Sequence, residues 1–591
     1  MESVLLVEKP SFSGTKQLNL QTLTSPSYSS FIKHDKYYST STTRRSVTTN
    51  CNGSENVERA LFTNMKKNNS KQAAVSKMLP TDHDYQYSAV VEASGGCIGI
   101  AGYLEGKNYF ITGATGFLAK VFIEKILRST LTVGKLYLLI KAENKAAATE
   151  RLQTEIIDSE LFICLKQMFG DSYQNFMIEK LVPVLGNVCE ANLGMDADLA
   201  EEIASEVDVI VNSAASTCFD ERYDVALNIN TMGPYRLLSF AKLCKKLQMF
   251  THVSTAYVNG EREGVVLEKP FKMGESIAAE RARSVAERSS MPMLDIEAEL
   301  SLAASTVANS TANVSQKMKD LGVQRAKAYG WQNTYVFTKA MGEMVLSSMR
   351  GDIPLVIMRP SVIECIAQEP VPGWIQGNRM LDPLIISYGK GRLPGFPMDP
   401  QAVIDVVPAD MVVNAFLAAL AKHGKEGKPS LSIYHISSSV ANPLVLEDVF
   451  SYSHAHFTTS ALLDTRGKKI DVERLQYFSS VENFSSYIQG IIRHELSRSS
   501  DYSTLPTGQL PERLETKCRK KVEHFFNLAK IYAPFMFYRG WFDNSNTENL
   551  FGMMSAEEQR MFGFNVRNIN WEDYFLNVHI PGLKRHVLKN N

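Results

Sequence analysis

The chain has 591 residues, of which 44% are hydrophobic and 21% charged, as in an ordinary globular protein. Lys and Arg together number 63, as do Asp and Glu, so the formal charge is zero. This balance argues against a general nucleic-acid binder, which needs a surplus of cations. No apolar run is long enough to cross a bilayer, so we expect no transmembrane segment and at most a peripheral membrane contact.

The first hundred residues differ in composition from the rest. Positions 1–50 hold eighteen Ser or Thr, six Lys or Arg and three acids, without a strong apolar periodicity. Such leaders are typical of organelle transit peptides, and we interpret residues 1–98 as a disordered leader that directs the chain to a plastid. A plain disordered tail is the alternative, since this composition cannot bury enough surface to fold. Initiation at Met65 or Met78 would give a cytosolic form without the leader.

The cysteines are scattered, with no Cys-x-x-Cys pair and no His at ligand spacing. This pattern predicts reduced thiols in a reducing compartment and no metal site. The eight residues are Cys51, Cys97, Cys164, Cys189, Cys218, Cys244, Cys365 and Cys518.

From about residue 99, short apolar runs alternate with helical stretches. Such runs predict strands that are covered on both faces, as in a parallel sheet flanked by helices. We expect strands at Tyr109–Thr112, Leu136–Ile140, Leu181–Leu185, Val207–Asn212, Met249–Val253, Pro354–Met358 and Leu431–Ile436, and helices at Phe117–Arg128 and Val225–Cys244. The predicted fold class is α/β, a Rossmann-type doubly wound parallel sheet over residues 99–440.

Two regions depart from this alternation. Residues 262–325 are rich in Ala, Ser, Glu and Lys, which predicts a helical insertion beside the functional site. From about residue 441 the pattern becomes helix-rich, so we expect a second, mostly helical domain at 441–591. Its end is dense in aromatic residues: Phe535, Phe537, Tyr538, Trp541, Phe542, Trp571, Tyr574 and Phe575.

The first expected strand leads into a glycine-rich loop at the start of a helix, an arrangement that binds dinucleotides. The loop reads Thr112-Gly113-Ala114-Thr115-Gly116-Phe117-Leu118-Ala119. Gly113 permits a tight turn, Gly116 lets the backbone approach a pyrophosphate, and Ala119 is small enough for close helix–strand packing. The free N–H groups at the helix start would then hold the phosphates.

The second expected strand ends at Lys141, where an NAD-specific site usually places Asp or Glu on the ribose hydroxyls. A cation there favours the 2′-phosphate of NADPH, with Arg151 assisting. Because of this cation, we predict NADPH as the cofactor. The alternative interpretation of Lys141 is a solvated side chain at a strand end.

Short-chain reductases use a Tyr-x-x-x-Lys pair on a helix, where a spacing of four residues places the phenol and the amine on one face. The chain has three such pairs, Tyr103/Lys107, Tyr137/Lys141 and Tyr335/Lys339. Only the third starts a helical segment between the fifth and sixth expected strands, where a nicotinamide would lie. Thr255 ends the fifth strand and is our choice over Ser254 for the hydroxyl that orients a substrate carbonyl.

Several segments together resemble the alcohol-forming fatty acyl reductases, extended short-chain dehydrogenases/reductases, and most closely the plant male-sterility-2 type. The resemblance covers about residue 95 to the end, and the segments are TGATGFLAKVFIEKILR, VDVIVNSAAST, THVSTAYVNG, YGWQNTYVFTKAMGE, IMRPSVIE, DVVPADMVVNA, FDNSNTENL and WEDYFLNVHIPGLKRHVL. It implies NADPH-dependent reduction of a long-chain acyl thioester, through an aldehyde, to a primary alcohol for pollen-wall or surface lipid. The substrate would be carried by coenzyme A or by acyl carrier protein.

The resemblance also implies roles for individual residues. Thr255, Tyr335 and Lys339 match the catalytic triad, and the remaining matches to the cofactor site are Gly113, Thr115, Gly116, Phe117, Leu118, Ala214, Ala215, Asn230, Arg359 and Pro360. Two positions depart from the pattern. Asn187 follows Gly186 where many relatives have Asp, so its adenine contact is in doubt. Cys365 replaces a small hydroxyl residue, and it permits a rival route through a covalent thioacyl enzyme, although ordinary packing is the simpler interpretation.

Other interpretations stay open from the sequence. The segment 372–380, with Trp374, either lines an acyl tunnel with the C-terminal aromatic residues or packs at a domain interface. The basic run 517–521 either docks an acidic acyl carrier protein or forms a solvated helix face. An aldehyde-forming reductase, a sterol dehydrogenase or a nucleotide-sugar epimerase would share the fold, and so would a non-catalytic cofactor sensor.

Overall fold

The computed structural model describes residues 97–284, 293–310, 312–498 and 512–589. The predicted transit peptide lies outside the described residues, apart from its last two positions. No described helix combines the length and the apolar character that a membrane crossing requires. The seven cysteines in the described part of the chain are all free thiols.

Seven parallel strands form the central sheet, in the order β12-β7-β5-β4-β1-β2-β3. Their bounds are β1 (Tyr109–Thr112), β2 (Leu136–Ile140), β3 (Leu181–Leu185), β4 (Val209–Asn212), β5 (Met249–Val253), β7 (Leu355–Pro360) and β12 (Leu431–Ile436). Strand β1 pairs with β2 on one side and β4 on the other, so the strand order reverses there. The predicted doubly wound sheet is confirmed, and its switch point, where ligands bind in such folds, lies between β1 and β4.

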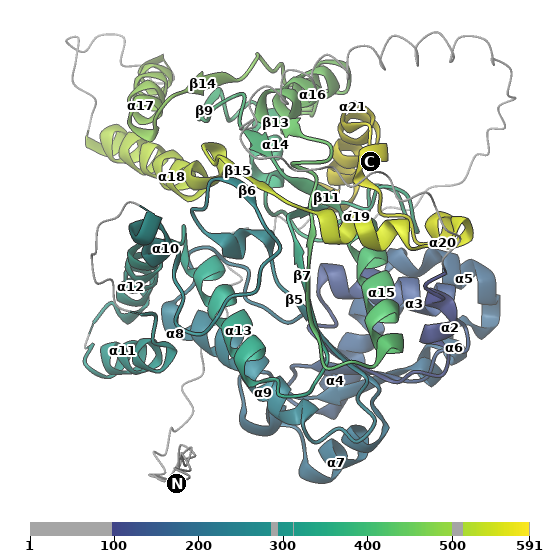
Figure 1. The fold of residues 1–591 in the computed structure, drawn as a ribbon. Helices are drawn as coiled ribbons and strands as arrows, with labels where there is room; N and C mark the ends of the chain where they lie inside the picture. Colours follow the sequence, from purple (N-terminus) through teal and green to yellow (C-terminus); the bar gives the residue numbers. More distant parts are fainter. Residues whose placement is uncertain (1–96, 285–292, 311, 499–511, 590–591) are drawn as a thin grey trace, which may run out of the picture. The chain divides into compact units, whose positions relative to one another are not determined.

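Alternate residues of the strands face two helical layers. One layer contains α2 (Ile100–Leu104), α3 (Phe117–Ser129) and α15 (Ala409–Glu426), and the other contains α7 (Ala197–Glu206), α9 (Met232–Ala241) and α13 (Thr334–Met349). In Figure 1, α3 and α15 lie on one side of β5 and β7, and α9 and α13 lie on the other. Ile111 packs in the first core and its neighbour Phe110 in the second, as the period-two geometry of a strand requires.

Further helices connect these elements on the β1–β4 half of the sheet. They are α4 (Lys145–Leu152), η1 (Gln153–Ile157), α5 (Ile163–Phe169), α6 (Tyr173–Lys180), α8 (Tyr223–Ala226) and η5 (Leu227–Thr231). The predicted helix Val225–Cys244 is thus three segments, because the π-helical η5 separates α8 from α9. Its buried Asn230 hydrogen-bonds to the backbone of Ser216, outside the helix.

The insertion at 262–325 is mostly helical, as predicted, but it also contains a strand. Its helices are α10 (Ile277–Ser284), α11 (Ile296–Ala308) and α12 (Val314–Tyr329). Strand β6 (Gly264–Val266) pairs in parallel with β15 (Gly540–Phe542). The expectation of helix alone was wrong at β6, because its partner strand lies far along the sequence.

The C-terminal region contributes to the same cores as the sheet. Its longer helices are α16 (Leu446–Thr459), α17 (Val481–Arg498), α18 (Glu512–Met536), α19 (Ser545–Gly552) and α20 (Ala556–Met561). Helix α19 packs against β12 and α15, and its Leu550 is buried in the core that contains Val412. The remaining short elements near the site are β8 (Val362–Glu364), α14 (Asp382–Gly389), β9 (Gly395–Pro397), β14 (Gln476–Phe478) and η8 (Tyr574–His579). The division at residue 441 stays a prediction.

Candidate functional site

A cavity of about 520 Å³ lies at the carboxyl ends of β1, β4, β5 and β7. Its wall includes most residues predicted from the sequence: Gly113, Thr115, Gly116, Phe117, Leu118, Lys141, Arg151, Asn187, Ala214, Ala215, Thr255, Tyr335, Lys339 and Pro360. The fold therefore brings the cofactor loop and the Tyr-x-x-x-Lys pair to one place. Of the three such pairs, only Tyr335/Lys339 has both members on the wall.

The loop after β1 has the backbone geometry of a dinucleotide cradle. Gly113 has φ +69°, and a Cβ there would lie 2.8 Å from the backbone nitrogen of Ala214. Gly116 is the N-cap of α3 and has no side chain to satisfy the first N–H groups of the helix. These groups and the helix dipole suit a pyrophosphate.

Lys141 and Arg151 lie together beside this loop. Arg151 Nη1 donates to the Lys141 carbonyl oxygen at 2.6 Å, and its Nη2 donates to Thr115 Oγ1 at 3.2 Å. Glu155 accepts from Arg151 Nε at 2.6 Å and holds the guanidinium in place. The arrangement provides two cations for an anionic group.

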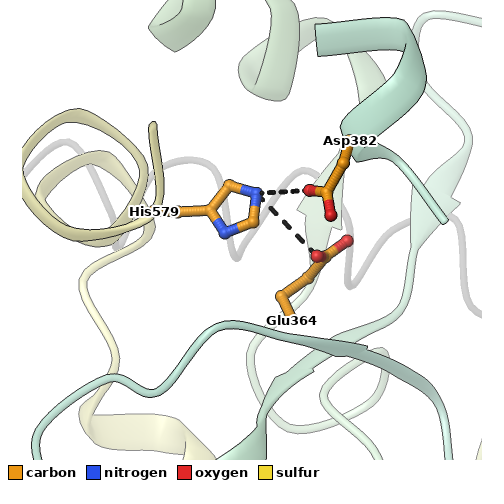
Figure 2. A group of neighbouring side chains, drawn as sticks. All are labelled: Glu364, Asp382 and His579. Carbon is orange, nitrogen blue, oxygen red and sulfur yellow. Dashed lines mark ion pairs between the residues drawn. The ribbon is translucent and has the colours of Figure 1, made fainter. Parts of the chain in front are cut away.

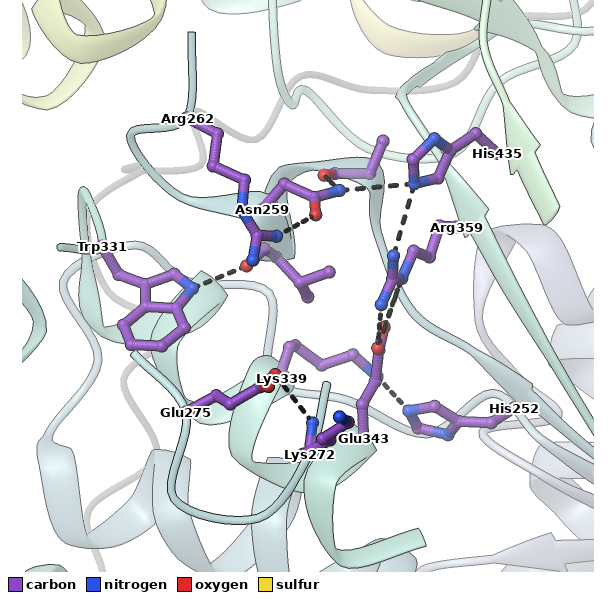
Figure 3. A network of polar contacts seen from close by, with 12 residues as sticks. His252, Asn259, Arg262, Lys272, Glu275, Trp331, Lys339, Glu343, Arg359 and His435 are labelled. Carbon is purple, nitrogen blue, oxygen red and sulfur yellow. Dashed lines mark hydrogen bonds and ion pairs between the residues drawn. The ribbon is translucent and has the colours of Figure 1, made fainter. Parts of the chain in front are cut away.

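Tyr335 and Lys339 occupy the first turns of α13, whose N-terminus is capped by Asn333. The Tyr335 ring stacks on Phe219 with centroids 6.0 Å apart, and its burial raises the pKa of the phenol to about 12. Burial lowers the pKa of Lys339 to about 8, although Glu343 opposes this shift. Lys339 Nζ donates to the Val253 carbonyl oxygen at 2.7 Å and lies 3.2 Å from His252 Nε2 (Figure 3).

Both hydroxyls considered at the end of β5 reach the cavity wall. Thr255 Oγ1 accepts a hydrogen bond from the Tyr257 backbone N–H at 3.3 Å, which leaves its own proton for another acceptor. Ser254 Oγ is buried without a hydrogen-bond partner among the described residues. The geometry thus keeps both as candidates.

Three predicted residues lie behind the wall instead of on it. Thr112 accepts from the Ala214 N–H at 3.1 Å and donates to Asn212. Asn230 hydrogen-bonds to Ser216 and, through Nδ2, to Thr338 of α13. Arg359 is fully buried, with Nη2 at 2.6 Å from a Glu343 carboxylate oxygen. These three side chains support the loops and α13 and do not line the cavity.

Asn187 and Cys365, which depart from the family pattern, differ in position. Asn187 lines the cavity and donates to Glu190 at 2.8 Å. Cys365 is fully buried off the wall, where its thiol contacts Tyr574 Oη at 3.3 Å and burial raises its pKa well above the usual range. A thiol in this position is a poor nucleophile, which argues against the covalent route.

Some residues of the cavity wall were not predicted from the sequence. Phe219, which stacks on both Tyr335 and Phe535, follows β4 by seven residues, and its place after a strand end was the available signal. From the segment 372–380 the wall contains Ile375, Gln376, Arg379 and Met380, whereas Trp374 packs against Phe117 with centroids 5.5 Å apart. Of the eight C-terminal aromatic residues only Phe535 lines the cavity.

A buried acidic cluster lies at the edge of the cavity. His579 Nε2 lies 3.1 Å from an Asp382 oxygen and 3.8 Å from a Glu364 oxygen. Figure 2 shows the ring of His579 facing both carboxylates. These three side chains are close enough to hold a metal ion, so the absence of a metal stays a prediction. Burial and, next, the charge of the neighbouring Asp382 raise the pKa of Glu364 well above its usual range, so we expect this carboxyl to keep its proton.

The change Glu364→Gln tests this protonation. A group with a raised pKa in the folded state binds its proton more tightly there, so it lowers stability as pH rises above the unfolded pKa. We expect the Tm difference between Glu364→Gln and the unmodified chain to favour the variant more at pH 9 than at pH 6. Thermal unfolding at both values checks this. A constant difference, or stabilisation of the unmodified chain by added zinc, would contradict a protonated Glu364.

A parallel sheet with this order, a glycine-rich phosphate loop and a Tyr-x-x-x-Lys pair together define an extended short-chain dehydrogenase/reductase. Two family models described as male sterility protein match residues 111–416 and 505–590. The chain belongs to this family, that of the fatty acyl-CoA reductases.

Similarity to individual relatives supports the same family. The chain is 53% identical, over 83% of its length and 80% of the relative, to the chloroplastic fatty acyl-CoA reductase 2 of Arabidopsis thaliana. It is 41% identical, over 82% of its length and 98% of the relative, to the alcohol-forming fatty acyl-CoA reductase of Simmondsia chinensis. Among solved structures, the terminal reductase domain of the myxalamid biosynthetic pathway aligns with a TM-score of 0.52 over 82% of this chain and 92% of that one. At 14% identity, that likeness supports the fold alone.

Proposed function

We propose that this chain reduces long-chain fatty acyl thioesters to primary alcohols with NADPH, through an aldehyde reduced in the same site. The observation that carries this proposal is the single cavity that joins the cofactor loop, the Tyr335/Lys339 pair and an apolar wall. The apolar wall suits an alkyl chain, and its residues include Ile375, Met380, Leu381, Ile404, Phe535 and Met536.

The residues present fit the proposed cofactor. A side chain at Gly113 would collide with the backbone of Ala214, so the loop suits close approach of a pyrophosphate. Lys141 and Arg151 would hold the 2′-phosphate by charge. When bound, NADPH supplies the hydride for both reductions.

The side chains of the site supply the proton and the orientation. Tyr335 would protonate the carbonyl oxygen as negative charge develops on it, and the Thr255 hydroxyl would donate a second hydrogen bond to that oxygen. Because burial raises the pKa of Tyr335 to about 12, the phenol keeps its proton at neutral pH and is by itself a weak acid. The positive charge of Lys339 would lower the pKa of the phenol toward the working pH.

The cofactor preference gives one prediction. Lys141→Ala should raise the KM for NADPH about 10- to 100-fold, because a charge-assisted hydrogen bond contributes about 1.5–3 kcal/mol. The KM for NADH should change little. Lys145→Ala is the matched control, since Lys145 is exposed on α4 and does not line the cavity. Equal changes for the two cofactors would contradict a 2′-phosphate contact.

The choice between the hydroxyls of Thr255 and Ser254 gives a second prediction. Thr255→Ala should lower kcat by about 10²-fold, the usual effect of losing one donor to a developing oxyanion. Ser254→Ala, which removes the neighbouring hydroxyl, should reduce kcat much less. Steady-state rates with palmitoyl-CoA compare them. The reverse order would transfer the orienting role to Ser254.

The carrier protein and the plastid belong to the proposal as well. Arg519, Lys520 and Lys521 are exposed on α18, the helix that also supplies Tyr532, Phe535 and Met536 to the cavity wall. At 1.5 Å per residue, Lys521 lies about 16 Å along the helix from Tyr532. An acidic carrier docked on these cations would thus lie near the acyl site. The name of the Arabidopsis relative supports a plastid address.

The test is a product assay with residues 80–591, NADPH and palmitoyl thioesters of coenzyme A and of acyl carrier protein. We expect hexadecanol by gas chromatography from at least one carrier, and a lower KM for the acyl carrier protein thioester. No reduction of either thioester, or reduction of a sterol or sugar nucleotide instead, would overturn the proposed function.

A further inference from the structure

Behind the cavity, buried polar side chains connect the cofactor loop to Lys339. The Ala214 N–H lies 3.1 Å from Thr112 Oγ1, and Thr112 Oγ1 lies 2.9 Å from Asn212 Oδ1. Asn212 Nδ2 lies 3.0 Å from His252 Nδ1, and His252 Nε2 lies 3.2 Å from Lys339 Nζ. All four side chains have at most 2% of their surface exposed.

One group in this series, the Ala214 backbone N–H, can only donate, and it fixes the direction of the other hydrogen bonds. The Ala214 backbone N–H must donate, so Thr112 Oγ1 accepts there and its single proton goes to Asn212 Oδ1. The amide orientation of Asn212 is thereby set, with its NH₂ group toward the ring of His252. Nδ1 of His252 is then the acceptor, and a neutral ring carries its proton on Nε2.

The ring is neutral for two reasons. Burial lowers the pKa of His252 well below its usual range, and the nearby Lys339 lowers it further. A neutral His252 in this orientation points its Nε2–H at Lys339 Nζ. An ammonium group has only donors, whereas a neutral amine has a lone pair that accepts this hydrogen bond.

The other groups around Lys339 do not outweigh the preference of the His252 N–H for the neutral amine. Glu343, one turn further along α13, favours the ammonium form, but it is bound to Arg359 of β7 through three hydrogen bonds. Figure 3 shows this pair, with His435 of β12 beyond it and His252 of β5 on the other side of Lys339. From its own helix, the phenol of Tyr335 shares the cavity wall with Lys339. The Val253 carbonyl accepts from either form of the amine.

We propose that Thr112, Asn212 and His252 are positioning residues that present an N–H donor to Lys339 and so make its protonation adjustable at the pH where the enzyme works. The inference rests on the role proposed above for Lys339. It assigns a role to Asn212 and His252, to which the family resemblance assigned none. It also places Thr112 in control of the Lys339 charge from behind the cavity.

The proposal predicts how activity depends on pH. Lys339 assists Tyr335 as an ammonium, so activity should fall as pH rises past the Lys339 pKa, which burial places at about 8. Asn212→Asp would accept from both Thr112 and His252 Nδ1–H, which turns Nε2 into an acceptor for the ammonium. Thr112→Val frees the Asn212 amide to rotate with the same result. Both changes should move the alkaline midpoint of activity upward by about one pH unit.

The first measurement needs neither cofactor nor substrate. Nitrogen NMR of the chain labelled with ¹⁵N in its 11 histidines reports the tautomer of each neutral ring, and His252→Gln assigns the signal. We expect the Nε2–H tautomer in the unmodified chain and the Nδ1–H tautomer in Asn212→Asp. An Nδ1–H tautomer in the unmodified chain would overturn the proposal, even if the chain reduced no acyl thioester.

The second measurement is the pH profile of kcat/KM for NADPH. Thr112→Ser keeps the hydroxyl and should keep the midpoint of the unmodified chain, whereas Thr112→Val and Asn212→Asp should raise it. A purely structural role would lower the rate of the variants at every pH and leave the midpoint unchanged, which would contradict the proposal. If Thr112→Val fails to fold, the tautomer of His252 in Asn212→Asp decides, because the added carboxylate would raise the midpoint by its charge alone.

Discussion

Replacement of Tyr335 by Phe is expected to lower kcat for acyl thioester reduction by about 10²- to 10⁴-fold, the contribution of a positioned general acid. The phenol is on the cavity wall, and its ring would keep its stacking on Phe219 in the variant. The change removes one oxygen atom and leaves Lys339 in place. Affinity for NADPH, measured by fluorescence titration, should therefore stay within a few-fold.

Tyr329→Phe is the matched control for this experiment. Tyr329 lies on α12 away from the cavity wall, and its hydroxyl accepts from Arg325 at 3.2 Å. Its loss should change turnover little. Normal turnover by Tyr335→Phe would remove the proposed general acid, and loss of NADPH binding would show that the variant had disturbed the site more widely.

The largest expected effect on stability comes from the buried ion pair behind Lys339. Arg359 and Glu343 are both fully buried, and the guanidinium makes three hydrogen bonds to the carboxylate. Glu343→Gln would leave the Arg359 charge uncompensated, so we expect a loss of about 3–5 kcal/mol in the free energy of unfolding. Guanidinium chloride unfolding measures it.

Two further variants show whether charge is the cause. The double change Glu343→Leu with Arg359→Met removes both charges and should recover much of the lost stability, since buried pairs are often replaceable by apolar residues. Glu280→Gln breaks the partly exposed pair with Arg262 and should lower stability by about 0–1 kcal/mol. Equal losses for Glu343→Gln and the double variant would indicate lost packing instead of an unpaired charge.

The sheet could be predicted because its strands are short and mostly apolar, a local pattern that needs no partner strand to be recognised. Five of the seven predicted strands coincide with β1, β2, β3, β5 and β12. The differences concern strand ends, as at Val209 for β4 and Pro360 for β7. Strand β6 was missed because it is three residues long and depends on pairing with Trp541 and its neighbours.

In the site, too, local sequence patterns could be predicted, whereas contacts between residues far apart in the sequence could not. The loop from Gly113 to Leu118 and the spacing of Tyr335 and Lys339 are local patterns, and the structure places both on one cavity wall. Arg359 was expected in the cofactor site, yet it is fully buried in an ion pair with Glu343 of α13. That His252 faces Lys339 could not be predicted, because the two residues are 87 positions apart and only the sheet order brings them together.

The most direct test of the central claim uses NADPH deuterated at the transferred hydrogen, with palmitoyl-CoA and the purified chain. Two hydride transfers in one site predict hexadecanol with two deuterium atoms on carbon 1, detected by mass spectrometry, and its loss in Tyr335→Phe. Hexadecanal with one deuterium as the final product would contradict the two-step reduction, and an absence of deuterated products would contradict the reductase itself.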